Sequence, residues 1–222
     1  QARYTEFLAF MLGQAGMADP AATAERVYAV EHKVAELEWA RQALRNRDLT
    51  YNKLTRAELE ALAPGFPLES VLRAAKFENV EHFLVAQLPP DQAEIDQLGL
   101  TPEYLSGIGG GLPAMMELLR ETPLETIKAY MTVRFLADHA PVLPKAIDDA
   151  QFAFYGTFLS GQPEQRPRWK RAIAATENQL GEQLGALYAA RYFPPESKAA
   201  MEELVENLRK ALAESIAEND WL

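Results

Sequence analysis

The chain has 222 residues, of which 48% are hydrophobic and 24% are charged, a balance typical of one globular domain or one lobe of a larger protein. Its 32 acidic residues outnumber its 22 lysines and arginines, and the net charge of −10 argues against binding to nucleic acid or anionic lipid. The chain contains no cysteine, which excludes disulfides, thiolate catalysis and cysteine-based zinc or iron–sulfur sites.

The N-terminal part of the chain predicts amphipathic helices. Apolar residues recur at helical spacing from Tyr4 onward, and Gly13 is expected to end the first helix. Asp19 and Pro20 form a helix start, because aspartate caps free backbone N–H groups and proline suits the first helical position. A single apolar stripe then predicts one helix reaching to about Arg47. Its members are Val27, Val30, Val34, Leu37 and Leu44.

Residues 64–113 predict a loop-rich excursion. Thr55 and Glu58 have the spacing of a capping box, which begins a short helix before this segment. The stretch 80–88 is the best strand candidate, and its partner strand could lie outside this sequence. The glycines at 107–111 predict a flexible loop, because neither the phosphate-binding-loop spacing nor the Rossmann spacing is present.

The C-terminal half predicts long helices. Thr122 to Glu125 combine a cap, a proline and a glutamate at the start of one helix, which Pro141 and Pro144 should break or kink. Residues 169–192 predict a long helix, and a last amphipathic helix follows Pro194 and Pro195. The predicted fold class is therefore mainly α: a bundle of long antiparallel helices with a loop-rich excursion at 64–113.

Few residues suggest chemistry. His32 and Glu36 share a helix face, but no second histidine follows at the spacing of a zinc helix, so a surface histidine is the preferred interpretation. A serine–histidine–aspartate set that meets only in space stays open. The basic cluster around Trp169 favours ion pairs at a helix start over a nucleic-acid patch, and the aromatic residues at 152–158 favour core over a peptide-facing surface. No catalytic, cofactor-binding or metal-ligating residue is predicted, and substrate-binding residues stay unassigned.

Five segments, in order along the chain, carry the motifs of one enzyme family. They are Leu49–Phe66, with LTYNKLT; Thr122–Arg134, with TPL and IKAY; Phe152–Arg171, with RWKR; Leu180–Phe193; and Glu196–Lys198 with the closing Trp221. Together they resemble the N-terminal, non-catalytic region of the neprilysin and endothelin-converting-enzyme family of zinc metallopeptidases. Animal members carry a cysteine where this chain has Ala172, so the resemblance implies a disulfide-free version, as in bacterial members.

This resemblance implies a function for the whole chain. Residues 1–222 would form a single helical lobe, a fragment of a larger two-lobe zinc metalloendopeptidase, and would limit access to short peptides enclosed between the lobes. The zinc and its ligands would belong to the parent enzyme, so the fragment would hold no cofactor and be inactive. Its partner would be the catalytic lobe of the same polypeptide, with no nucleic acid and no membrane segment. The resemblance implies an extracytoplasmic location, although no signal peptide precedes Tyr4.

Two alternatives stay open. The chain could be a stand-alone helical scaffold that binds a peptide or another protein through an apolar groove. It could also be an independent hydrolase whose active-site residues are dispersed in the sequence. If the chain is a lobe cut from a larger enzyme, we expect it to expose the apolar surface that normally meets the other lobe.

Overall fold

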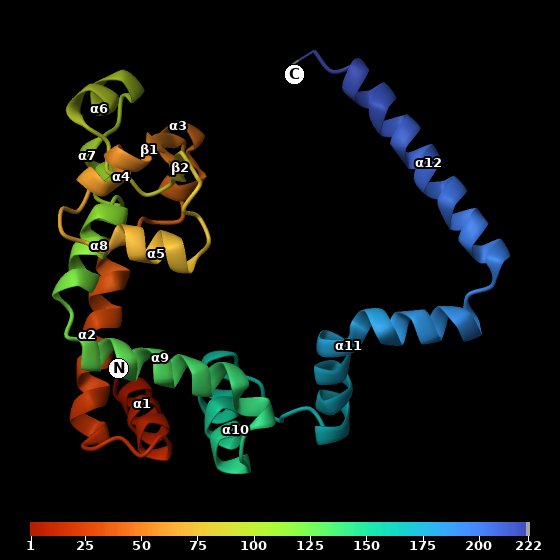
Figure 1. Ribbon diagram of the computed structural model, residues 1–222, viewed down its shortest axis with the longest axis horizontal. Helices are drawn as coiled ribbons and strands as arrows, with labels where there is room; N and C mark the ends of the chain where they lie inside the picture. Colours follow the sequence, from red (N-terminus) through yellow and green to blue (C-terminus); the bar gives the residue numbers. More distant parts are fainter. Residues whose placement is uncertain (221–222) are drawn as a thin grey trace. The chain divides into compact units, whose positions relative to one another are not determined.

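The computed structural model describes residues 1–220, and most of them lie in helices, which confirms the mainly α fold class (Figure 1). Residues 1–163 form one unit, unit 1, and the chain from Glu164 onward forms another, unit 2. The expected single lobe over 1–222 stays a prediction. Trp221, which contributes to the resemblance, lies outside the described residues.

Four helical segments form the main core of unit 1. The helices α1 (Ala2–Gln14) and α2 (Pro20–Leu37) pack against each other, and α9 (Leu124–His139) and α10 (Lys145–Gln151) pack against them (Figure 1). A short 3-10 turn, η2 (Ala140–Val142), separates α9 from α10, which confirms the predicted break at the two prolines. The π-helix η3 (Phe152–Leu159) follows α10. Fully buried apolar side chains hold this core together, among them Leu8, Met11, Leu12 and Val27.

The excursion extends over the whole segment between α2 and α9, beyond the predicted 64–113, and is built from short elements. In chain order they are η1 (Ala43–Arg45), α3 (Arg47–Thr50), β1 (Asn52–Thr55), α4 (Arg56–Ala61), α5 (Leu68–Ala74), β2 (His82–Val85), α6 (Gln92–Leu98), α7 (Pro102–Leu105) and α8 (Gly111–Glu121). They surround a second core that includes Leu59, Leu72 and Met116. The excursion thus has an apolar interior of its own, beside that of the long helices.

The predicted strand finds its partner within the chain. β2 pairs with β1 in an antiparallel two-stranded sheet, with Asn52 opposite Val85 and Thr55 opposite His82. Thr55 also caps α4 in a capping box with Glu58, as the spacing predicted. One residue therefore ends the strand and starts the next helix.

Two predicted helix boundaries were wrong. The helix that begins at Pro20 ends at Leu37 and not near Arg47, because Glu38 adopts an extended backbone (φ −70°, ψ 148°). At the other boundary, Thr122 does not cap α9. Its hydroxyl donates to the carbonyl oxygen of Leu118 at 2.6 Å, and Pro123 occupies the N-cap position.

Trp39 explains why α2 stops. Its side chain is only 4% exposed, and its indole N–H donates to the carbonyl oxygen of Gly109 at 3.1 Å. Its backbone N–H donates to the Gln87 side chain at 2.9 Å, and the next backbone N–H donates to the Gly107 carbonyl at 2.8 Å. These long-range hydrogen bonds replace the bonds that a continued helix would make.

The glycines of the 107–111 loop are required by close packing. A Cβ atom at position 109 would lie 2.3 Å from the carbonyl oxygen of Leu37, and one at position 111 would lie 2.2 Å from that of Gln87. Gly111 also has a positive φ of 58°, which side chains with a Cβ rarely adopt. The structure thus gives these glycines a packing role rather than the flexibility expected from the sequence.

We expect Gly109→Ala to lower the free energy of unfolding by about 1–3 kcal/mol, because the added methyl group must displace backbone atoms. Gly13→Ala is the matched control, since a Cβ at this exposed position of α1 meets only the Pro20 ring at 3.9 Å. Urea unfolding of the full chain, followed by circular dichroism, measures both. Equal stability of Gly109→Ala and the wild type would contradict this account of the loop.

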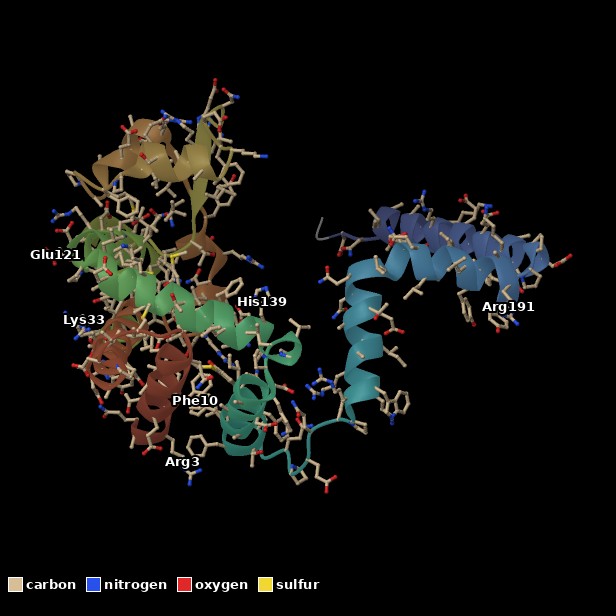
Figure 2. All side chains as sticks on the ribbon, turned by 60° about the horizontal axis from the view of Figure 1, so that its bottom comes forward. Arg3, Phe10, Lys33, Glu121, His139 and Arg191 are labelled. Carbon is tan, nitrogen blue, oxygen red and sulfur yellow. The ribbon has the colours of Figure 1, made fainter. Side chains whose placement is uncertain are left out.

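The described part of unit 2, residues 164–220, contains two long helices and no buried core. In α11 (Arg168–Tyr192) and α12 (Pro195–Ala217) no residue is buried, and side chains project from all sides of both helices (Figure 2). α11 is interrupted at Leu180 (φ −126°, ψ 23°), so the predicted helix over 169–192 is present with a kink. None of the described helices has the length and apolar composition needed to cross a membrane.

We expect limited proteolysis of the full chain to begin within unit 2. Helices without buried contacts open easily, whereas the elements of unit 1 are held by three clusters of buried apolar side chains. Trypsin and thermolysin, used separately at low ratios, should both leave a resistant product close to residues 1–163, identified by mass spectrometry. Early cleavage inside α1, α2 or α9 would show that this view of the two units is wrong.

Candidate functional site

The histidines do not assemble a metal site. His32 and Glu36 lie one turn apart on α2, as predicted, with Nδ1 and Oε1 3.4 Å apart and both side chains more than half exposed. His82 lies in β2, and His139 lies at the end of α9 (Figure 2). The His139 ring stacks on Phe135, with ring centroids 4.2 Å apart. Within residues 1–220 no group of three His, Cys, Asp or Glu side chains is placed to hold a metal ion. These residues therefore do not fit a zinc centre.

An apolar cavity lies where α2, α8 and α9 meet in unit 1, and we call it the α2–α8–α9 groove. Its volume is about 510 Å³, within the size range of ligand sites in proteins. Most of its lining is apolar or hydroxyl-bearing. The lining residues are Val30, Glu31, Val34, Ala35, Glu38, Met115, Leu119, Thr122, Thr126, Ile127 and Tyr130.

A hydrogen bond from α1 anchors one acidic residue of this groove. The Tyr4 hydroxyl donates to Oε2 of Glu31 at 2.7 Å. Burial raises the pKa of Tyr4 above its usual range, and the neighbouring Glu31 carboxylate raises it further. Tyr4 therefore stays protonated at neutral pH and keeps donating, which holds the Glu31 carboxylate in place.

Aromatic rings extend this contact into the core. The Phe154 ring, 8% exposed, stacks on Phe7 and Tyr4 with centroids 5.0 and 5.2 Å apart. Arg134 lies 3.5 Å from the Tyr155 hydroxyl, whose pKa is raised mainly by burial. Phe158 is half exposed, and the Arg3 guanidinium lies 4.9 Å from its ring centroid. Of the aromatic residues at 152–158, only those that face inward form the expected core.

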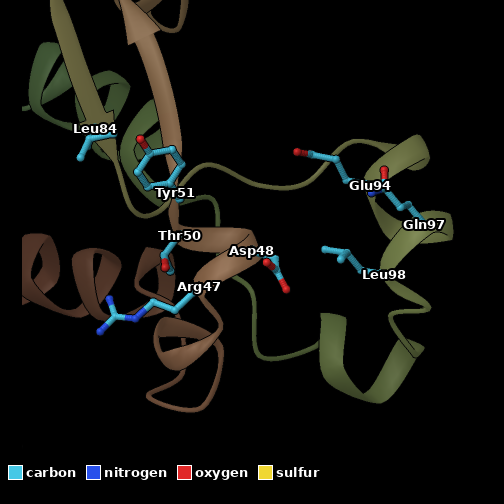
Figure 3. A pocket seen from close by; sticks show the side chains of 8 residues that line it. All are labelled: Arg47, Asp48, Thr50, Tyr51, Leu84, Glu94, Gln97 and Leu98. Carbon is cyan, nitrogen blue, oxygen red and sulfur yellow. The ribbon is translucent and has the colours of Figure 1, made fainter. Parts of the chain in front are cut away.

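A second, more open hollow lies beside the two-stranded sheet (Figure 3). Its volume is about 840 Å³, and its lining carries charges of both signs. Asp48 of α3 and Leu98 of α6 point toward each other across it, and the exposed Tyr51 and Leu84 lie at its edge (Figure 3). This mixed lining indicates no single ligand chemistry.

The basic cluster lies at the start of α11. The Arg171 Nε donates to the carbonyl oxygen of Arg166 at 3.2 Å, and the Lys170 ammonium lies 5.3 Å from the Trp169 ring centroid. These cations thus make contacts within their own segment, near the beginning of the helix.

The sequence model for the N-terminal region of peptidase family M13 matches residues 1–222, the full length of the sequence. The chain belongs to peptidase family M13. This confirms the resemblance to neprilysin and endothelin-converting enzyme that the sequence motifs indicated. The M13 motif residue Arg134 lies on α9 beside Tyr155 of η3, so this motif position joins two elements of the core.

Several M13 proteins are similar to this chain. Neprilysin-2 of Drosophila melanogaster is 27% identical over 86% of the chain, and human endothelin-converting enzyme 1 is 24% identical over 89% of it. The open-state structure of the zinc metalloprotease Zmp1 of Mycobacterium tuberculosis matches the whole chain with 32% identity and a TM-score of 0.71. The chain spans 24% of the length of those two curated relatives and 32% of the Zmp1 chain.

Sequence reasoning did not find the α2–α8–α9 groove. Val30 and Val34 belong to the predicted apolar stripe of α2, which by itself indicates only a buried helix face. In the structure both valines are half buried and line the groove, together with Glu31 and Glu38. The available signal was two acidic residues seven positions apart beside an apolar stripe. Helical periodicity alone does not show that two other helices stand beside that stripe.

Replacing Tyr4 by phenylalanine should reduce stability at neutral pH by about 0.5–1.5 kcal/mol, through the lost hydrogen bond to Glu31. Because the pKa of Tyr4 is raised in the folded chain, its contribution is complete below the ordinary tyrosine pKa of about 10 and is lost above it. The free energy of unfolding should therefore fall less steeply above about pH 10 in Tyr4→Phe than in the wild type.

The exposed Tyr51 supplies the control for this pH dependence. Urea unfolding of the wild type, Tyr4→Phe and Tyr51→Phe at several pH values separates the two tyrosines. The same loss of stability with rising pH in all three proteins would contradict the assignment to Tyr4.

Proposed function

We propose that this chain is the substrate-gating helical lobe of a neprilysin-like zinc metalloendopeptidase that hydrolyses short peptides. The lobe itself contributes no zinc ligand and no catalytic residue. Its packed helices restrict access to the enclosed space between two lobes, because a rigid wall can exclude folded proteins by size without supplying chemistry. As a member of M13, the chain would pair with the catalytic lobe of the same polypeptide.

The observation that carries this proposal is the exposed apolar surface of unit 2. Along α12 every member of the predicted apolar stripe is exposed, including Leu208 and Leu212 at 61% each. α11 similarly exposes Leu187 and Tyr188. Two amphipathic helices with no buried residue require a protein surface to cover them. The curated relatives are about four times as long as this chain, and the remainder of a polypeptide of that length would supply such a surface.

The chemistry of the parent enzyme follows from its relatives. Zmp1 is described as a zinc metalloprotease, and the relatives from animals are a neprilysin and an endothelin-converting enzyme. Zinc would activate water for attack on a peptide bond, with all zinc ligands in the remainder of the parent polypeptide. An extracytoplasmic location is part of the same proposal, and it rests on the family resemblance alone.

A single substitution tests whether another part of the complete polypeptide covers the apolar stripe of α12. In the complete polypeptide, Leu208→Asp should lower stability by about 2–4 kcal/mol, because it places an unpaired charge in an apolar contact. In the 222-residue chain alone, the same substitution should change stability by less than about 0.5 kcal/mol, since Leu208 is already exposed. Glu206→Ala on the same helix is the control for lost side-chain contacts. Equal effects of Leu208→Asp in both proteins would contradict the proposal.

Metal analysis and a peptide assay test whether zinc binding and catalysis both require the remainder of the complete polypeptide. The purified 222-residue chain should hold no stoichiometric zinc and should not cleave a quenched-fluorescent short peptide. The complete polypeptide should hold zinc and lose its activity in the presence of a chelator. Chelator-insensitive cleavage by the chain alone would instead favour an independent hydrolase. A coding sequence that stops soon after Leu222 would favour the stand-alone binding scaffold.

A further inference from the structure

The α2–α8–α9 groove carries charge of one sign only. Glu31 and Glu38 are the charged residues among those that line it, and its remaining lining is neutral. An apolar lining favours apolar side chains, and two carboxylates beside it favour cations. The groove therefore fits a ligand that has an apolar face and positive charges beside that face.

The two carboxylates have a defined spacing. Glu31 and Glu38 are seven positions apart on α2 and at its C-terminal cap, which corresponds to about 10.5 Å along the helix axis. Val34 lies between them in the sequence of α2, and Leu119 of α8 and Ile127 of α9 also line the groove. A second helix lying along α2 would present residues at positions i and i+7 at the same separation.

Cations of the neighbouring elements do not neutralise Glu38. Lys128 pairs with Glu125 at 2.8 Å, and Arg120 pairs with Glu117. Among residues 1–220, Glu38 makes no ion pair within 4.0 Å. Glu31 accepts a hydrogen bond from Tyr4, an uncharged donor, and Arg134 of α9 lies beside Tyr155. Glu38 is thus the stronger of the two cation-binding positions.

We infer that the α2–α8–α9 groove binds a basic amphipathic helical peptide segment, with apolar side chains in the groove and Lys or Arg residues paired with Glu38 and Glu31. This inference concerns unit 1 alone and does not rest on the proposed peptidase function. Helix-in-groove binding of this kind joins the apolar stripe of a peptide helix to a cavity between receptor helices. Ionic pairing at the edge of the groove then sets the preference for basic partners.

A second copy of the chain is a poor occupant. The net charge of −10 opposes self-association, and the exposed helix α12 carries five glutamates against three basic residues. Such a helix would bring like charges to Glu31 and Glu38. The occupant is therefore a different segment, with an excess of positive charge.

The test uses a labelled peptide and the full 222-residue chain. The probe is a fluorescein-labelled, alanine- and leucine-rich helix of about 16 residues with two lysines seven positions apart, and its binding is followed by fluorescence anisotropy. Matched peptides replace both lysines by glutamine or by glutamate. The lysine peptide should bind at least about 3-fold more tightly than the glutamine peptide and about 10-fold more tightly than the glutamate peptide, and the preference should weaken with salt.

Variants of the chain locate the bound peptide. Glu38→Gln should weaken binding of the lysine peptide by about 2- to 5-fold and leave the glutamine peptide unchanged. Leu119→Gln, at a half-exposed position that should not disturb folding, should weaken all peptides by about 5-fold or more. Glu36→Gln and Leu124→Gln are the matched controls, because both are exposed and lie outside the groove.

Three results would overturn the inference. The first is no saturable binding of the lysine peptide. The second is equal binding of the lysine and glutamate peptides. The third is binding that is unaffected by Leu119→Gln and Glu38→Gln but is lost in Leu208→Gln, which would place the peptide on the exposed face of α12 instead.

Discussion

The arrangement of unit 1 depends on the close contact between the glycine-rich loop and the backbone at Leu37 and Gln87. Only glycine fits there, since an added Cβ atom would overlap backbone carbonyl oxygens. The contact allows the Trp39 indole to reach the Gly109 carbonyl, which turns the chain away from the axis of α2. It also sets the start of α8 at Gly111, because the Leu112 N–H donates to the Gln87 carbonyl at 2.8 Å.

The α2–α8–α9 groove follows from this geometry. α2 ends beside the loop from which α8 begins, and both α8 and α9 contact α2. Three helices held in this way leave a cavity with an apolar lining. Tyr4 adds a further constraint by fixing Glu31 from α1. The same contacts that terminate α2 therefore place two carboxylates beside an apolar surface.

Unit 2 differs from unit 1 because its helices form without burying side chains. Its helices form because their local sequence favours helix, with Pro195 at the first helical position of α12 and an apolar stripe at helical spacing. Helix formation alone does not bury that stripe, and in α11 and α12 no residue is buried. The chain belongs to M13, and its curated relatives are much longer than this chain. Under the proposed function, the remainder of such a polypeptide would cover the apolar stripe.

The sequence by itself determined the helical fold class, the M13 family and the local starts of structure, such as the Asp19 cap and the Thr55–Glu58 capping box. Each of these signals acts between residues a few positions apart, so it can be recognised without knowing the fold. The tertiary structure decided where α2 ends, which strand pairs with β2, and where a groove opens between three helices. These features depend on contacts such as Trp39 with Gly109, between residues 70 positions apart, and no local pattern specifies which distant residues will meet.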